Sequence, residues 1–269
     1  MGRLQVLCAT VGQEDFSLVR AMNIRTDVIF ANQNGRNETR EADFGAFRAR
    51  IISTDTRGVG INRNLALMHS SGELCLLADD DVRYVDGYEA IVTQAFDANP
   101  QADVLIFNLY DDSSWAIPRR TRVRWYNFMR FGACRVAVRG AAVRRQGIFF
   151  NTCFGGGCLY QSGEDTLFLR DCLRSGLKIY GLPVYIAAMK YERPSTWFRG
   201  YDEKFFYDKG AVCAAISRPF ARLLCLRLLL VKKQMRRETG LSFRTAWRLM
   251  LAGIRGYKDG QGFENRSLV

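Results

Sequence analysis

The sequence predicts an α/β domain built on a mostly parallel sheet with helices on both faces, followed by a basic helical extension. Strand-like and helix-like segments alternate over the first 110 residues, a pattern typical of parallel sheets covered by helices. Residues 74–78 (LCLLA) are apolar at every position, as in a strand buried on both faces. After Pro194 the composition changes and basic residues exceed acidic ones.

The first half of the chain gives the strands and helices of the expected sheet. A polar turn at residues 32–35 is expected after the second strand, and helices are expected at 16–23 and from Asn62 to Gly72. Another helix begins at Asp86, with Glu89 completing a capping box, and ends near Pro100. The expected strands are 4–11, 27–31, 48–53, 74–78 and 103–109.

The second half is less regular between residues 111 and 150, apart from a strand expected at 134–139. A helix at 163–176 and a strand at 178–187 then complete the core. Residues 211–236 and 242–255 read as two basic amphipathic helices. We therefore expect a catalytic α/β domain at residues 1–190 and a helical extension at residues 191–269.

Three consecutive aspartates, Asp79, Asp80 and Asp81, follow the buried strand 74–78. Ligands of parallel α/β sheets bind at the carboxyl ends of strands, where this cluster is expected. Mutual repulsion would raise the pKa values of the three carboxyls unless a positive group lies among them. Mg²⁺ and Mn²⁺ prefer carboxylate oxygens, and Mg²⁺ keeps positions for water and phosphate. The alternative is a solvated acidic turn, and the buried strand favours the metal site.

A second acidic position, Asp165, precedes the apolar part of the helix expected at 163–176. It could be the acidic residue of a capping box in which Ser162 is the N-cap. It could instead be a general base that takes a proton from an acceptor hydroxyl. Three glycines at residues 155–157 favour the second interpretation, because glycine lets the backbone approach a bulky substrate.

These residues resemble a known pattern. The segments Gly60–Ala66, Ser71–Glu73 and Leu76–Val82 look like the core of family 2 glycosyltransferases of the GT-A fold. Residues 163–170, with Gly176 and Lys178, are similar to the second signature of that family. The resemblance covers roughly residues 4–190, and it implies a GT-A-like sheet and a nucleotide-sugar-dependent transferase.

The resemblance implies a role for each matching donor-side residue. Asp79 and Asp81 occupy the DxD positions, and Asp81 is the direct ligand expected for Mg²⁺ or Mn²⁺. Asp79 would also lie near the ribose or the sugar of the donor, with Asp80 beside it. Arg63 would lie close to the diphosphate, and Thr10 would lie where the first strand meets the nucleoside.

On the acceptor side the resemblance implies that Asp165 is the catalytic base of an inverting reaction. Gly156, Gly157 and Glu164 are expected to bind the acceptor. One departure concerns the base of the nucleotide: Asn32 and Gln33 stand where the family usually has two aspartates. An amide oxygen can accept a hydrogen bond from the N–H of uracil or thymine, so Asn32 is expected at the base and a UDP-sugar, the usual donor of the family, is the expected donor. An amide can also donate, which leaves the base preference open.

The implied activity is metal-dependent, inverting transfer of a sugar to a hydroxyl of a saccharide or lipid-linked acceptor, as in surface polysaccharide synthesis. A nucleotidyltransferase is the nearest alternative, but residues 10–14 lack the basic glycine-rich loop of that class. A basic nucleic-acid-binding protein is the other alternative. No nucleic-acid motif is present, so nucleic acid is not expected as a partner.

The net charge of +12 lies mainly in the extension, where residues 190–269 hold 17 Lys or Arg and 7 Asp or Glu. Apolar residues recur there at helical spacing, namely Phe220, Leu223, Leu224, Leu228, Val231 and Met235. Such a helix could lie on an anionic membrane surface or pack on the core with its arginines in water. The sequence leaves both open.

The eight cysteines form no CxxC pair and no zinc module. Residues 4–9 enter a strand directly, so no signal peptide is expected. Reduced thiols are then the default, and the expected location is the cytoplasm, with peripheral binding to the inner face of the cell membrane.

Overall fold

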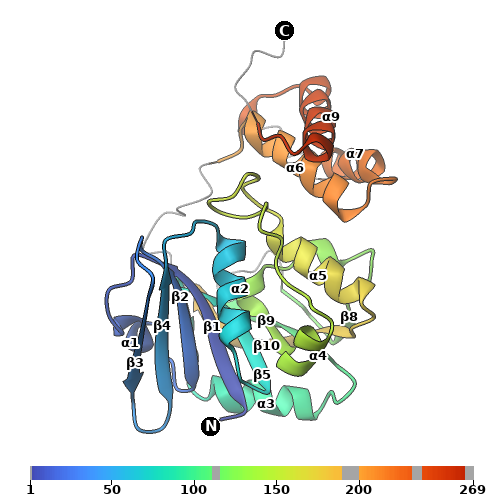
Figure 1. Cartoon of the computed structure of the whole chain (residues 1–269). Coiled ribbons are helices and arrows are strands. Elements are labelled where there is room, and N and C mark those ends of the chain that lie inside the picture. The colour runs from blue at the N-terminus through green and yellow to red at the C-terminus, as the bar shows by residue number, and fades with distance from the viewer. Residues whose placement is uncertain (1, 111–115, 190–199, 232–237, 264–269) are drawn as a thin grey trace.

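The computed structural model describes residues 2–110, 116–189, 200–231 and 238–263. Its strands form one sheet in the order β3-β4-β2-β1-β5-β9-β7-β10-β6, with β8 paired to β10 (Figure 1). The strands are β1 (Leu4–Val11), β2 (Asp27–Gln33), β3 (Glu38–Asp43), β4 (Arg48–Thr54), β5 (Leu74–Asp79), β6 (Val82–Tyr84), β7 (Val104–Tyr110), β8 (Thr121–Arg122), β9 (Val136–Arg139) and β10 (Ile179–Met189).

The parallel part of the sheet brings the polar ends of three strands together. Strands β4, β2, β1 and β5 pair in parallel, with Thr10 beside Asn32 and Ala9 beside Asp79. Strand β9 then pairs antiparallel with both β5 and β7, and β7 is parallel to β10. The predicted mostly parallel α/β sheet is confirmed, and its carboxyl edge carries the acidic cluster.

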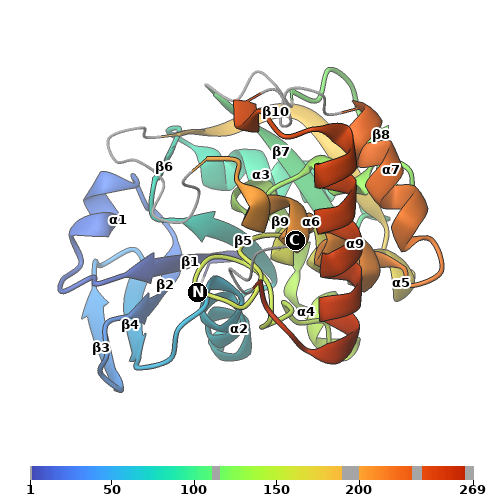
Figure 2. The same ribbon diagram turned by 90° about the horizontal axis from the view of Figure 1, so that it is seen from above.

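Helices cover both faces of this sheet. Seen from above, the sheet lies between α1 and α3 on one side and α2 and α4 on the other (Figure 2). Two separate hydrophobic clusters fill the two layers; Val19 and Phe96 belong to one, and Leu67 and Phe168 to the other. The helices of the core are α1 (Ser17–Ala21), α2 (Val59–His69), α3 (Tyr88–Asp97), α4 (Gly140–Arg145) and α5 (Glu164–Arg174).

The predicted helix caps at Asn62 and Asp86 are wrong, and Ser162, the cap in the alternative interpretation of Asp165, does not cap a helix either. Helices α2, α3 and α5 begin after Gly58, Gly87 and Gly163, each with a positive φ, and no side chain caps them. Asn62 lies inside α2, where its side chain donates to the backbone oxygen of Thr10. Asp86 accepts a hydrogen bond from Asn23 instead of capping α3. Glycine reaches left-handed φ without a steric cost, so sharp turns into these helices replace the caps.

The edge of the sheet also differs from expectation. Strand β2 continues through Asn32 and Gln33, where a turn was predicted, because both residues pair with β1 and β4. Strand β3 was not predicted; its residues alternate between exposed and half-buried, as in an edge strand. The extra length of β2 carries the side chain of Asn32 into the interior.

The extension contains α6 (Glu203–Ile216), α7 (Ala221–Val231) and α9 (Phe243–Asp259) in its described parts. The single helix predicted at 211–236 is wrong, since α6 ends at Ile216 and a turn through Pro219 precedes α7. Gly210 and Gly253 let α6 and α9 cross closely, because a Cβ at either glycine would meet backbone of the other helix. Helix α6 also joins the core cluster through Tyr207, Ala211 and Val212.

The proposed boundary between residues 190 and 191 lies outside the described residues, as do Met235 and the basic residues around it. None of the helices in the described ranges is long and apolar enough to cross a membrane.

Candidate active site

One side of the candidate site is built where β1, α2 and β5 meet. The Thr10 hydroxyl donates to an Asp80 carboxylate oxygen at 2.7 Å. The Asn62 amide donates to the Thr10 carbonyl at 2.9 Å, which fixes α2 against the end of β1. Asp79, Asp80 and Asp81 line a cavity of about 670 Å³ together with Thr10. The three aspartates therefore face a cleft, as the sequence predicts.

Arg63 joins the two acidic motifs. It is 4% exposed, and its Nη2 lies 2.7 Å from Asp79 Oδ1. Its Nη1 lies 3.0 Å from Glu164 Oε1 and 2.6 Å from Asp165 Oδ1. One guanidinium on α2 thus binds a carboxylate at the end of β5 and two carboxylates at the start of α5. The planar fork of arginine suits such a bridge, because its donors have fixed directions.

The electrostatics of this cluster favour a proton acceptor. Burial, together with the Glu164 carboxylate, raises the pKa of the Asp165 carboxyl to about 7, while Arg63 acts in the opposite direction. Burial opposes the charge of Arg63, yet Asp79, Asp165 and Glu164 hold the pKa of its guanidinium well above the ordinary value. Arg63 therefore stays cationic while Asp165 can exchange a proton near neutral pH.

A second side of the cavity is formed by the segment before α5. The Val59 N–H donates to the Gly156 carbonyl at 2.9 Å, so the glycine-rich turn is attached to the start of α2. A Cβ on Gly155 would meet Val59 and the Glu164 carboxylate, and one on Gly163 would meet Val212 of α6. Both glycines also have positive φ. The close neighbours of Gly155 and Gly163 are therefore protein atoms, those of Gly163 from the extension, and the approach of a substrate to residues 155–157 stays a prediction.

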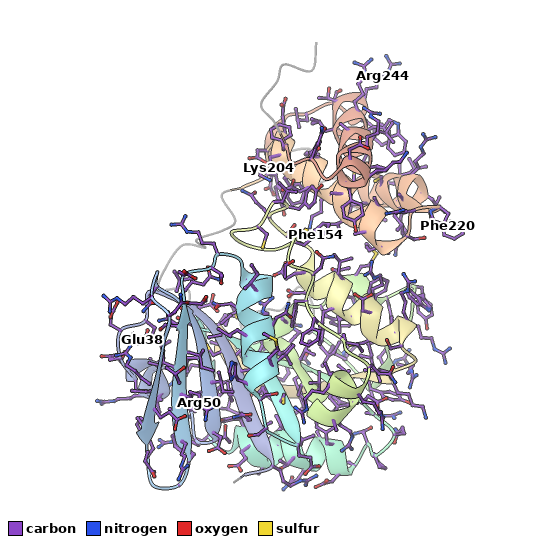
Figure 3. All side chains as sticks on the ribbon, viewed as in Figure 1. Glu38, Arg50, Phe154, Lys204, Phe220 and Arg244 are labelled. Carbon is purple, nitrogen blue, oxygen red and sulfur yellow. The ribbon has the colours of Figure 1, made fainter. Side chains whose placement is uncertain are left out.

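Lys209 and Arg130 also line the cavity, and sequence reasoning missed both. Lys209 comes from α6, and its Nζ donates to the Ser162 hydroxyl at 3.0 Å. Burial lowers the pKa of the Lys209 amine, while Glu164 and Asp165 are among the groups that act against this shift. No motif marks a lysine so far along the chain; the packing of α6 on the core brings it here. Figure 3 shows this junction, where Phe154 of the core lies below Lys204 of α6.

The predicted site residues fall into two groups. Asn32 is fully buried: its side-chain nitrogen donates to the Gln13 carbonyl and to Ser53, and its oxygen accepts from the Gln13 N–H. Gln33, the next residue, reaches the cavity instead. Gly157 is exposed and is not part of the lining. The structure brings together the remaining residues: Thr10, Arg63, Asp79, Asp80, Asp81, Gly156, Glu164 and Asp165.

The carboxylates at the cavity could hold a divalent cation only together with a bound ligand. Five carboxylates line the cavity against three cationic side chains, those of Arg63, Arg130 and Lys209. No group of three or more acidic, His or Cys side chains in the described ranges is arranged to hold a metal by itself. Mg²⁺ binds through one or two carboxylates and completes its shell with water and phosphate oxygens. Asp79 and Asp81 can serve in that way beside a diphosphate.

A comparison with known protein families identifies the class of this protein. The model of the family described as "Glycosyl transferase family 2" matches residues 17–151, half of the chain. The chain belongs to this family and is a glycosyltransferase, which decides against a nucleotidyltransferase. Asp165, Lys209 and the whole extension lie beyond the matched range.

Solved structures of two other proteins have a similar fold. The structure of S. aureus TarS 1-349 in complex with UDP-GlcNAc is 13% identical, with a TM-score of 0.60 over 97% of this chain and 93% of that one. The mannosyltransferase PcManGT from Pyrobaculum calidifontis, in complex with GDP-Man and Mn²⁺, is 14% identical, with a TM-score of 0.51 over 97% of this chain and 76% of that one. At these identities the likeness establishes the GT-A-like fold. No curated protein matches the sequence.

Proposed function

We propose that the protein transfers a sugar from a nucleoside diphosphate to a hydroxyl acceptor with inversion, with Asp165 as the base. The main observation that supports this proposal is the pair of contacts made by Arg63, which binds Asp79 on the proposed donor side and Asp165 on the proposed acceptor side. Two motifs far apart in the sequence thereby face one cavity. A base and a leaving-group site must share such a space for direct displacement.

The proposed reaction proceeds in one displacement. The acceptor oxygen forms a bond to the anomeric carbon while the bond from that carbon to the diphosphate oxygen breaks, and its electron pair leaves with the nucleoside diphosphate. The Asp165 carboxylate takes the acceptor proton, and Arg63 holds this carboxylate in place. A bound Mg²⁺ or Mn²⁺, held by Asp81 and Asp79, would neutralise the charge that develops on the diphosphate.

Residues around the cavity support the proposed binding of donor and acceptor. Thr10 and Gln33 line its nucleoside end, so we assign contact with the base to Gln33 and the support of the Gln13 loop to Asn32. Gly156 and Glu164 lie on the acceptor side, and exposed Gly157 adjoins them. Lys209 is a further candidate for contact with the acceptor. The UDP-GlcNAc bound by TarS supports a UDP-sugar donor, and the Mn²⁺ of PcManGT supports a metal.

The acceptor proposed from the sequence is a saccharide or a lipid-linked saccharide, as in surface polysaccharide synthesis. The eight cysteines are free, which supports the proposed location in the cytoplasm, where thiols stay reduced.

A donor screen tests this function. Thermal unfolding is followed with UDP-GlcNAc, UDP-glucose or GDP-mannose, each in Mn²⁺, Mg²⁺ or EDTA, because a true ligand raises the unfolding temperature. We expect one UDP-sugar to protect with metal, and Asp81→Asn to remove the metal-dependent part. If the UDP-sugar raises the unfolding temperature as much in EDTA as in Mn²⁺ or Mg²⁺, the metal assignment is contradicted.

The stereochemistry of the product tests the displacement separately. NMR of the first product formed should show the anomeric configuration opposite to that of the donor, with nucleoside diphosphate released. A product that retains the donor configuration contradicts the role of Asp165 as the base.

A further inference from the structure

Helix α7 is apolar on two opposite faces. Its inner face packs on α6 and α9 through Ala221, Cys225 and Leu229, which are buried. The side chains on its outer face are between 37% and 67% exposed. We call this set the outer α7 face; it consists of Phe220, Leu223, Leu226, Leu230 and Val231.

This exposure separates the predicted apolar stripe into two parts. Leu224 and Leu228 are half-buried against the helical cluster, whereas Phe220, Leu223 and Val231 point outward and are joined by Leu226 and Leu230. At 100° per residue, Leu223, Leu226 and Leu230 fall within one narrow sector of the helix. Single exposed leucines are common on proteins, but a contiguous apolar patch marks an interaction surface.

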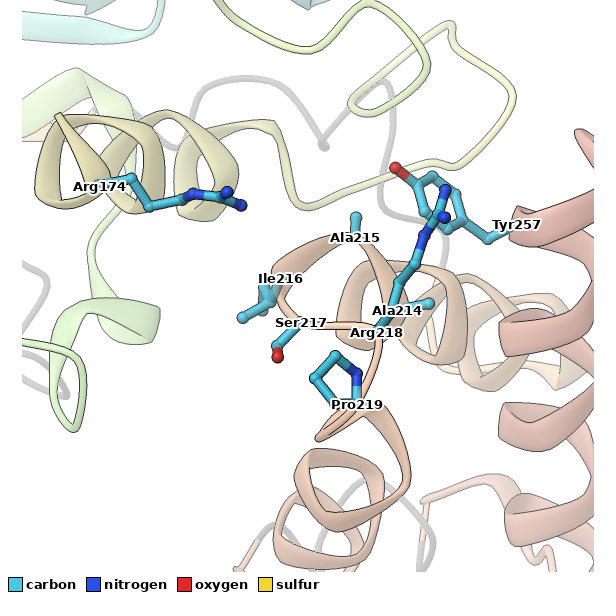
Figure 4. Close-up of a pocket in the computed structure, with 8 residues that line it drawn as sticks. All are labelled: Arg174, Ala214, Ala215, Ile216, Ser217, Arg218, Pro219 and Tyr257. Atoms are coloured by element: carbon cyan, nitrogen blue, oxygen red, sulfur yellow. The ribbon is translucent and has the colours of Figure 1, made fainter.

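The charged side chains within residues 217–231, the segment that carries the outer α7 face, are all positive. Arg222 and Arg227 are exposed on the same helix, and residues 217–231 contain no Asp or Glu. A cavity of about 300 Å³ at the turn before α7 is lined by Arg174 of α5, Arg218 and the ring of Tyr257 (Figure 4). Basic side chains thus lie both within the apolar face and at its beginning.

We propose that the outer α7 face binds an anionic membrane surface. Its leucines and Phe220 enter the boundary between headgroups and acyl chains, and Arg218, Arg222 and Arg227 pair with lipid phosphates. The helix has 11 residues, so it lies along the surface and does not span the bilayer. Long arginine side chains can place their stems in the apolar layer and their guanidinium groups among the headgroups.

The charge pattern favours a membrane over a second copy of the chain. In a two-fold dimer formed by this face, the arginines of one copy would meet the same positively charged surface on the other copy, and no carboxylate on residues 217–231 could pair with them. An anionic bilayer offers apolar depth and negative charge in the same place. The binding does not depend on the transfer reaction, because no residue of the outer α7 face lines the active-site cavity.

Flotation of the full chain with vesicles tests the proposal. Neutral phosphatidylcholine vesicles are compared with vesicles that also contain phosphatidylglycerol, at low and high salt. We expect the protein to bind the anionic vesicles at least tenfold more strongly than the neutral vesicles. Binding to the anionic vesicles should fall as the salt concentration rises. Absence of flotation, or equal flotation with both compositions, overturns the proposal.

Paired variants locate the surface. Leu223→Gln with Leu230→Gln should reduce flotation at least tenfold, whereas Met68→Gln, at an apolar side chain that is 61% exposed on α2, should leave it unchanged. The double variant Arg222→Gln with Arg227→Gln should reduce flotation. Its control, Arg25→Gln with Arg145→Gln, removes the same charge elsewhere and should reduce flotation much less. Equal flotation of the leucine pair and wild type overturns the assignment to α7.

Light scattering measures the oligomeric state and so tests the alternative that the outer α7 face joins two copies of the chain. If wild type is a dimer, the leucine pair is a monomer and neither protein floats, the face is an interface between copies and the membrane proposal is wrong. Donor protection in the thermal assay should be the same in all these variants. Loss of flotation with intact donor protection therefore separates failure of this surface from failure of the proposed chemistry.

Discussion

The two sides of the active-site cavity are built in different ways. The side proposed to bind the nucleotide comes from β1, α2 and β5; β1 and β5 are neighbours in the parallel sheet, and α2 and β5 lie within the family match, which begins after β1. The side proposed to bind the acceptor comes from the segment before α5 and from α6, which are distant from each other in sequence and lie outside that match. Local motifs define the first side, whereas packing between core and extension defines the second.

The two sides of the cavity therefore depend on different kinds of contact. The nucleotide side depends on backbone pairing and on short contacts such as Thr10 with Asp80. The acceptor side depends on Val212 and Lys209 of the extension, which contact Gly163 and Ser162. Arg63 is the link between the two sides, so changes at Arg63 and on either side of it test the comparison.

The largest effect is expected at Arg63. Arg63→Met leaves Asp79, Glu164 and Asp165 close together without their shared cation. We expect a loss of about 3–5 kcal/mol in the free energy of unfolding together with loss of transfer, measured by denaturant unfolding and by release of nucleoside diphosphate. Arg145→Met, at an exposed arginine, is the control. A stable, active Arg63→Met protein would show that the two sides are independent.

Asp165→Asn is expected to affect catalysis without loss of the fold. Removing a general base typically lowers kcat by about 10²–10⁴-fold, and the amide can still occupy the place beside Arg63. Donor protection in thermal unfolding should persist, since Asp165 lies on the acceptor side. Near-normal transfer by the folded variant contradicts the base assignment.

Gly163→Ala tests the contact between core and extension. Its Cβ would meet Val212 at a φ of 116°, and we expect a loss of about 1–3 kcal/mol in the free energy of unfolding. Gly176→Ala is the matched control, because Gly176 also has positive φ but no atom lies near its Cβ. Adding Val212→Ala should restore more stability to Gly163→Ala than to Gly176→Ala. Equal behaviour of both glycines would remove the proposed role of α6 at this turn.

The smallest effect is the pH dependence. Because the pKa of Asp165 is raised to about 7, the carboxyl is protonated below that pH and cannot accept a proton. The value of kcat/KM should rise with pH and level off above about 7, since it reports the free enzyme.

The same group affects stability with the opposite sign. The folded-state pKa exceeds the ordinary value of 3.8, so between these pH values the native state binds more protons than the unfolded state. The free energy of unfolding therefore falls as pH rises through this window. Asp165→Asn should reduce that slope; an unchanged slope would contradict the raised pKa.

The sequence by itself determined the parallel sheet, the position of the acidic cluster at its edge and the family. The apolar run ending at Ala78 and the aspartates after it suffice for this, because burial of a central parallel strand and the meeting of strand ends follow from local pattern. The second acidic position, Asp165, was found from its glycine-rich approach and from the family resemblance.

Tertiary structure decided what no local pattern contains. Asn62, Asp86 and Ser162 look like helix caps, but glycines with positive φ begin those helices, and the polar side chains bind elsewhere. Asn32 is drawn into the interior because β2 runs two residues longer than its apolar run. Lys209 enters the cavity, and Leu223 faces outward, because of how α6, α7 and α9 pack. Such contacts join residues far apart in the chain, and their geometry depends on side-chain packing that periodicity does not encode.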